Sequence, residues 1–162
     1  MRWLAVVAAV VLLAGCGKET EPSRNESAKI VWKTPALKYA DMAFLRVKTS
    51  SVEMELYSVA NALARLRITP RKVCSGTFSC MDASAFNARY LSVHYPSDTL
   101  YRILNGEPIF GGEHLVKTRH GFTQRLRKKG KYDITYRVLK NRVEFRDTIN
   151  HIVISVEKGT HK

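Results

Sequence analysis

Histidine, serine and carboxylate side chains do much of the chemistry of enzymes, and in this chain their spacing matches no catalytic or metal-binding pattern. The five histidines never stand as H-x-x-x-H or H-E-x-x-H. Ser75 precedes Gly76 without the G-x-S-x-G frame of a nucleophile elbow. Asp133, Glu144 and Asp147 fall at strand positions that we expect to be exposed, where carboxylates usually only solvate a sheet. We therefore expect no catalysis, no cofactor and no bound metal.

Two cysteines, Cys74 and Cys80, lie in KVCSGTFSCMD, where two strand-like runs flank a Ser-Gly turn. Their separation of six suits a disulfide between opposite positions of a hairpin. Such a bridge would close a loop of about seven residues and contribute about 2–3 kcal/mol in the chain-entropy model. The alternative is a redox or metal site, but the spacing is not C-x-x-C and no second pair of ligands follows.

The first residues of the chain are typical of an export signal. Met1 and Arg2 form a short basic start, and residues 3–14 (WLAVVAAVVLLA) are apolar. Twelve apolar residues are too few to cross a bilayer, which needs about 20. Export would place the domain in an oxidising compartment, where a disulfide persists.

The end of this signal, Leu13-Ala14-Gly15-Cys16, resembles the lipobox of bacterial lipoproteins. The resemblance implies that residues 1–15 are removed, that the sulfur of Cys16 carries a diacylglyceryl group, and that the new N-terminus carries another acyl chain. Several acyl chains anchor a protein firmly where one does so only marginally. Gly17 stands where an aspartate would favour the inner membrane, so we expect an outer-membrane anchor with the domain in the periplasm. The alternative is a plain secretory signal in which Cys16 is incidental.

The remainder of the chain has the composition of one globular domain with a basic surface. It follows a polar stretch that reads as a lipidated, flexible tether over residues 16–29, and we expect the domain over residues 30–162. The whole chain of 162 residues has 27 Lys and Arg against 14 Asp and Glu, which favours anionic partners. The basic run at residues 125–131 fits anionic headgroups, an acidic protein or simply a solvated hairpin tip, and nucleic acid is an unfavoured partner.

The C-terminal part shows four successive segments in which apolar and polar residues alternate. They cover residues 121–128, 132–139, 142–148 and 151–158, with short turns between them. This pattern predicts an antiparallel meander with one apolar and one basic face.

The N-terminal part is less regular. Residues 42–48 and 51–57 are expected strands. Residues 58–68 are ambiguous: Leu66 and Ile68 fit a strand, whereas propensity favours a helix. Two short helices are expected midway, over residues 83–91 and 98–105. Asp82 would cap the first, Ser97 would cap the second, and Gly106 would end it. About eight strands with two inserted helices predict an α+β fold, a curved antiparallel sheet or incomplete β-barrel with short helices covering one side.

The order of these elements resembles the family of outer-membrane lipoprotein receptors called LolB, over about residues 40–158. Three segments carry the resemblance: residues 52–68, residues 98–110 and the strands after Gly121. In the second segment the matching positions are Leu100, Tyr101, Leu104, Gly106 and Pro108, with Ile103 where the family has tryptophan. The family and its soluble carrier LolA fold as an incomplete barrel around an apolar cavity.

The resemblance implies that acyl chains of lipoproteins pass from a periplasmic carrier into this cavity and then into the outer membrane, without a nucleotide. The family inserts cargo through a loop with an exposed leucine, and here Val59 or Leu63 would take that place. The candidate cavity residues are Phe44, Met54, Leu56, Leu66, Leu100, Ile103, Leu104, Phe110, Ile134, Tyr136, Phe145, Ile152 and Ile154. For each of them the alternative is a packed core, and for the whole protein it is a structural or interaction lipoprotein of the envelope with no lipid cargo and a basic partner-binding face.

Overall fold

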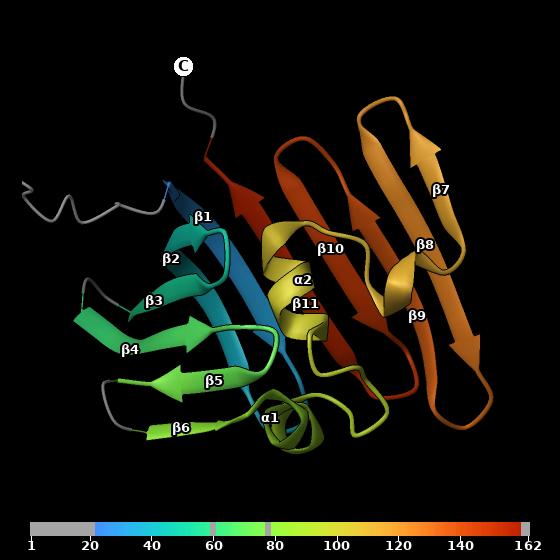
Figure 1. Cartoon of the computed structure of the whole chain (residues 1–162), viewed down its shortest axis with the longest axis horizontal. Coiled ribbons are helices and arrows are strands. Elements are labelled where there is room, and N and C mark those ends of the chain that lie inside the picture. Colours follow the sequence, from blue (N-terminus) through green and yellow to red (C-terminus); the bar gives the residue numbers. More distant parts are fainter. Residues whose placement is uncertain (1–21, 59–60, 77–78, 160–162) are drawn as a thin grey trace, which may run out of the picture.

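The computed structural model describes residues 22–58, 61–76 and 79–159, which form one antiparallel sheet with two short helices (Figure 1). The strands in this part of the chain are β1 (Ser23–Lys33), β2 (Lys38–Lys48), β3 (Val52–Ser58), β4 (Asn61–Ile68), β5 (Lys72–Ser75), β6 (Ser79–Asp82), β7 (Leu115–Thr118), β8 (Gly121–Lys128), β9 (Tyr132–Val138), β10 (Arg142–Asp147) and β11 (Ile152–Lys158). The helices are α1 (Ala83–Tyr90) and α2 (Thr99–Asn105), followed by a 3₁₀ turn at Phe110–Gly112.

The order of strands in the sheet is β6-β5-β4-β3-β2-β1-β11-β10-β9-β8-β7. Two meanders, one before the helices and one after them, therefore join where β1 pairs with β11. The register at this junction sets Ile30 opposite Val156 and Trp32 opposite Ile154, and all four side chains are buried. The chain thus closes its core by pairing its first and last strands.

Alternation along the strands separates an inner, apolar face from an outer, polar face. In β11 the side chains of Ile152, Ile154 and Val156 are buried, and in β10 those of Val143 and Phe145. The arginines of β8, β9 and β10 point to the opposite face, where they are exposed. The predicted meander with one apolar and one basic face is confirmed.

Helix α2 packs on the inner face and contacts both β3 and β10. Four strand spacings separate those strands in the sheet order, about 19 Å along a flat sheet, whereas a helix is about 10 Å wide. The sheet must therefore curve around α2, and Figure 1 shows the strands of the two halves running in clearly different directions. Tyr101 of α2 fixes this position by donating a hydrogen bond of 3.0 Å to the carbonyl oxygen of Thr49.

The helix ends follow the predicted signals in part. Gly106 ends α2 in the left-handed conformation (φ 71°), as expected. The N-cap of α2 is Asp98 rather than Ser97. Asp82 is the N-cap residue of α1, but its side chain makes no capping hydrogen bond.

The predicted α+β class, with helices covering one side, is wrong. Among the described residues 57% lie in strands and 13% in helices, and the sheet is open and has eleven strands rather than about eight. The helices are only eight and seven residues long, so they cover part of the inner face and leave the rest to side chains of the sheet.

Strand pairing overturns two other expectations. The region expected to be helical is strand β4, because Leu66 pairs with Met54 on one side and with Ser75 on the other. Tertiary pairing overrides helix propensity here. The tether expected over residues 16–29 is too long, since residues 23–29 belong to β1 and pair with β2. A polar segment can form this strand because its backbone bonds to β2 even where its side chains stay exposed.

No helix within the described ranges is long and apolar enough to cross a membrane. The export signal and Cys16 lie outside the described residues.

Candidate functional site

An apolar groove of about 230 Å³ lies on the inner face of the N-terminal meander, beside α1. It is open to solvent, and its lining is mostly apolar, with Ser75 and Ser79 of the β5–β6 hairpin among the few residues that carry polar groups. The lining residues are Trp32, Leu37, Leu56, Ala64, Leu66, Val73, Ser75, Ser79, Met81, Phe86 and Tyr90.

The floor of the groove is aromatic. Phe86 and Tyr90, spaced i,i+4 on α1, stack with their ring centroids 4.7 Å apart, and Phe86 also lies 6.2 Å from the buried ring of Trp32. The side chain of Arg89 lies over the Tyr90 ring at 5.3 Å. These contacts between aromatic rings hold the floor of the groove in place.

The groove exists because the inner face of β4, β5 and β6 is incompletely filled. Ala64 is small, and Ser75 and Ser79 are short and polar, so the sheet offers little bulk opposite α1. Leu66 and Met81 remain partly exposed, although both pack against the core. Partly exposed apolar side chains around a hollow are the expected lining of a site for an apolar ligand.

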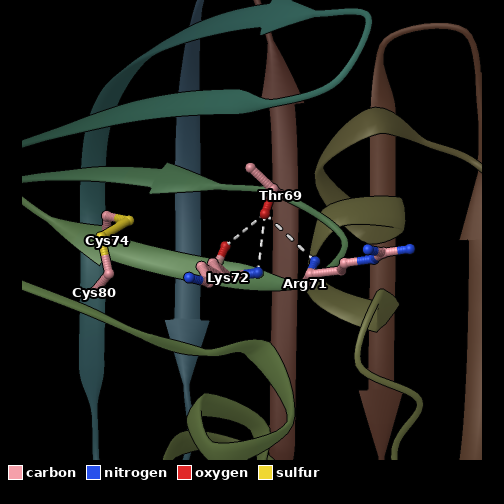
Figure 2. The surroundings of a disulfide bond; sticks show 5 residues. All are labelled: Thr69, Arg71, Lys72, Cys74 and Cys80. Carbon is pink, nitrogen blue, oxygen red and sulfur yellow. Dashed lines mark hydrogen bonds between the residues drawn. A yellow bond between two sulfur atoms is a disulfide. The ribbon is translucent and has the colours of Figure 1, made fainter.

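The disulfide predicted between Cys74 and Cys80 is confirmed, and it reinforces the wall of the groove that β5 and β6 form. The two cysteines are directly opposite in the pairing of β5 and β6 (Figure 2). Their side chains lie on the face opposite to Val73 and Met81, which line the groove. Strand β6 is an edge strand of four residues that pairs only with β5, so few hydrogen bonds hold it in the sheet. The disulfide adds a covalent link between these two strands.

The turn before β5 is held by one side chain. Figure 2 shows the hydroxyl of Thr69, which accepts hydrogen bonds from the backbone N–H of Arg71 and of Lys72 and donates one to the carbonyl oxygen of Lys72. This hydroxyl holds the turn between β4 and β5 and so fixes where β5 begins.

Two of the candidate cavity residues, Leu56 and Leu66, line the groove. Most of the others fill a packed core around α2, each no more than 1% exposed. They are Met54, Leu100, Ile103, Leu104, Ile134, Tyr136, Phe145, Ile152 and Ile154. Phe110 packs against this core and touches Tyr95 and Tyr132. Phe44 lies on the outer face and is 57% exposed, because its neighbours on β2, Ala43 and Leu45, point inward.

The sequence reasoning missed most of the groove. Phe86 and Tyr90 carried a signal, their i,i+4 spacing on an expected helix, but they were assigned only a helical role. Trp32 lay outside the strands that were expected, and Ala64 lay in the expected helix. Their meeting depends on the pairing of β1 with β2 and of β3 with β4, which the local pattern does not encode.

The end of the β3–β4 hairpin carries the candidate membrane loop. Leu63 is 61% exposed, and the pairing passes from Leu56–Ala64 to Tyr57–Ala62, so Leu63 is the extra residue of a bulge. A bulge redirects a side chain out of the regular alternation. Leu63 does not line the groove; it lies in a separate surface hollow together with Glu55 and Arg65. Val59 lies outside the described residues.

The expectation that Asp147 occupies an exposed strand position is wrong, because its side chain is buried and only 1% exposed. The alternation of side chains along β10 could have predicted this burial, since Asp147 lies on the same face as Val143 and Phe145. Its carboxylate accepts a hydrogen bond of 2.5 Å from the hydroxyl of Tyr95. Burial would by itself raise the pKa of Asp147, but hydrogen bonds from Tyr95, Asn150 and backbone amides outweigh it and lower this pKa.

The Tyr95 hydroxyl is held protonated by the same arrangement. Burial is the largest cause of its raised pKa, followed by the hydrogen bond to Asp147. The pair orders the turn between β10 and β11, since Asp147 also accepts from the backbone N–H of Ile149 and of Asn150. In the part of the chain that the structure describes, no three His, Cys, Asp or Glu side chains gather where they could hold a metal ion.

Comparison of the chain with models of protein families finds no match, and comparison with curated proteins finds none either. The function is therefore argued from the groove, the outer face and the N-terminal sequence.

Proposed function

We propose that the protein is a lipid-anchored acceptor of the cell envelope that takes acyl chains of lipoproteins from a periplasmic carrier and passes them to the outer membrane. The observation that carries the proposal is the solvent-open apolar groove between α1 and strands β3 to β6. No catalytic step is required, because an acyl chain moves between apolar environments along a gradient of affinity.

The size of the groove supports transfer rather than storage. Its volume of about 230 Å³ is below the range of about 300–1,000 Å³ for pockets that enclose whole drug-sized ligands. It would hold part of one acyl chain. Burying about five methylene groups is worth about 4 kcal/mol, which corresponds to a dissociation constant near the millimolar range. A ligand held this weakly is released readily into a membrane.

The N-terminal sequence and the β3–β4 hairpin support the location. The lipobox-like residues ending at Cys16 would anchor the chain by acyl groups, and β1 begins only a few residues later, at Ser23. Leu63 offers an exposed apolar side chain near the end of the β3–β4 hairpin, which could contact a bilayer. The resemblance of residues 98–110 to the lipoprotein receptors points the same way.

A second candidate function is a non-enzymatic interaction lipoprotein without lipid cargo. The packed core around α2 favours it, because nine of the candidate cavity residues are fully used in that packing. In that case the groove would be a surface hollow and the basic outer face would bind the partner.

The test uses the chain from Gly17 onward, which retains every contact of the described fold, and a dansyl-labelled fatty acid as the probe. We expect the natural chain to bind the probe with an increase in fluorescence. Leu66→Glu places a charge inside the groove and should weaken binding at least tenfold, because an acyl chain cannot solvate a carboxylate. Leu139→Glu, the same change at an exposed site far along the sheet, should leave binding unchanged.

A transfer assay then separates the two candidate functions. A carrier loaded with radiolabelled lipoprotein is mixed with each chain, and cargo on the acceptor is counted. Movement of cargo to the natural chain and not to Leu66→Glu supports the acceptor. If no cargo moves and no probe binds, the acceptor is excluded and the interaction lipoprotein stands. Circular dichroism of each variant checks that it is folded.

A further inference from the structure

The outer face of the C-terminal meander carries an arginine cluster, Arg125, Arg137 and Arg146, that the groove does not use. All three side chains are exposed, and they come from the neighbouring strands β8, β9 and β10. Within the described part of the chain, none of the three is in an ion pair. Arg127 and Arg142, on the same face, pair with Asp133 and Glu144 at 2.7 and 3.0 Å.

The register of the strands places the cluster around one threonine. Arg125 is directly opposite Thr135 on one side, and Arg146 is directly opposite Thr135 on the other. With a strand spacing of about 4.8 Å, the two arginine backbones lie about 10 Å apart, with the threonine between them. Arg137 lies two residues further along β9 on the same face. The three guanidinium groups can therefore converge above the Thr135 side chain.

The net charge of this face suits a bound anion. Five arginines stand on this face of β8, β9 and β10 against two carboxylates. Glu144 is directly opposite Arg137 and forms its ion pair with Arg142, so this face keeps a net positive charge. A shallow groove of about 450 Å³ runs beside Arg137 and Arg146. Its other polar lining residues are Thr135, Arg142, Glu144 and Ser155, and Glu144 is the one carboxylate among them. Guanidinium groups bind phosphate oxygens in pairs, and hydroxyls add further donors.

We propose that the arginine cluster binds the phosphate groups of anionic lipid headgroups and so holds the outer face of the domain against a membrane surface. An exposed sheet face offers many arginines at once to a two-dimensional array of phosphates, and each contributes to binding near an anionic surface. An N-terminal lipid anchor, where present, raises the effective concentration of headgroups, so weak individual contacts suffice. The cluster and the apolar groove lie on opposite faces of the sheet, so both can be occupied at once.

The test measures co-sedimentation of the chain from Gly17 onward with vesicles of phosphatidylcholine alone and of equal parts phosphatidylcholine and phosphatidylglycerol. We expect binding to the anionic vesicles only, weakening as salt is added. The combined variant Arg125→Gln, Arg137→Gln and Arg146→Gln should bind roughly a hundredfold more weakly, from the loss of three basic contacts. The control replaces Arg67, Arg71 and Arg119, three exposed arginines elsewhere, by glutamine. It removes the same net charge and should bind within a few-fold of the natural chain.

Three outcomes would overturn the proposal. Equal losses in the two triple variants would show that net charge, not the cluster, drives binding. Absence of binding to anionic vesicles by the folded natural chain would exclude a membrane surface. Tighter binding to a single-stranded oligonucleotide than to vesicles, lost only in the cluster variant, would assign the cluster to nucleic acid. None of these measurements depends on the acyl groove, so the proposed acceptor function stands or falls separately.

Discussion

The carboxylate of Asp147 is held by five hydrogen bonds. Two come from the side chains of Tyr95 and Asn150, and three come from the backbone amides of Asp133, Ile149 and Asn150. A buried carboxylate with this many donors is stable only while it is ionised. The residue therefore links the turn between β10 and β11 to the protonation state of a single group.

We predict that Asp147 makes the stability of the protein depend on acidity. Its pKa in the folded protein lies below the ordinary 3.8, so the stability it contributes is present above that value and is lost as the pH falls through it. Asp147→Asn should lower the free energy of unfolding at neutral pH by about 1–3 kcal/mol, because backbone donors lose an ionised acceptor. It should also flatten the decline in stability below about pH 5, as the pH falls past the ordinary pKa toward the lower pKa of the folded state. Urea unfolding at several pH values measures both effects.

The matched control is Asp133→Asn, which removes only the partly exposed carboxylate paired with Arg127. Its effect on stability should stay below about 1 kcal/mol. If the two variants have equal stability at neutral pH, the network around Asp147 does not have the role assigned to it.

At the scale of elements, the approach of β8 to β9 depends on a glycine. Gly121 begins β8 with φ 155°, and a Cβ atom there would lie 1.8 Å from the carbonyl oxygen of Val138 at the end of β9. That oxygen belongs to the backbone, so the overlap can be relieved only by moving the strands apart.

We predict that Gly121→Ala destabilises the protein by roughly 2 kcal/mol or more, because the end of the β8–β9 ladder must shift. Gly130→Ala is the control, since Gly130 also has a positive φ (70°) but nothing lies within 4 Å of the added Cβ. It should cost about 1 kcal/mol. Thermal unfolding of both variants provides the comparison, and equal midpoints would contradict the close approach.

Strands β8 to β11 and the end of α2 follow local sequence patterns, whereas strand β4 does not. The strands β8 to β11 were predicted because their residues alternate strictly, and the α2 terminus was predicted because only glycine readily adopts the left-handed conformation of Gly106. The segment that forms β4 is ambiguous in sequence, because Val59, Ala62, Leu63 and Leu66 fit a helical stripe while Leu66 and Ile68 fit a strand. The bulge at Leu63 breaks its alternation, and this feature appears only once β4 is paired with β3.

At the scale of the whole molecule, the two meanders share one core. They meet at the β1–β11 pairing, and α2 contacts β3 of one meander and β10 of the other. Gln124 of β8 holds the segment after α2 by accepting from the backbone N–H of Ile109 and donating to its carbonyl oxygen. Neither meander has a complete inner surface without the other.

We predict that the chain from Gly17 onward unfolds in a single step. Trp32 is its one tryptophan and lies at the junction of the two meanders, so its fluorescence reports on the shared core. Its urea transition should coincide with that of the far-ultraviolet circular dichroism, which reports on all the strands. Two separated transitions would show instead that the meanders fold independently.

The sequence by itself determined the local properties of this protein. It determined the disulfide across a short hairpin, the two-faced C-terminal meander and the glycine that ends α2, and it predicts an export signal with a lipobox-like end. Each depends on residues close together in the chain. The tertiary structure decided the rest: that residues 23–29 form a strand, that the sheet curves around α2, that Asp147 is buried, and that Trp32, Leu66 and Phe86 meet at one groove. These features arise from pairing between distant strands, where backbone hydrogen bonds and shared burial outweigh local propensity.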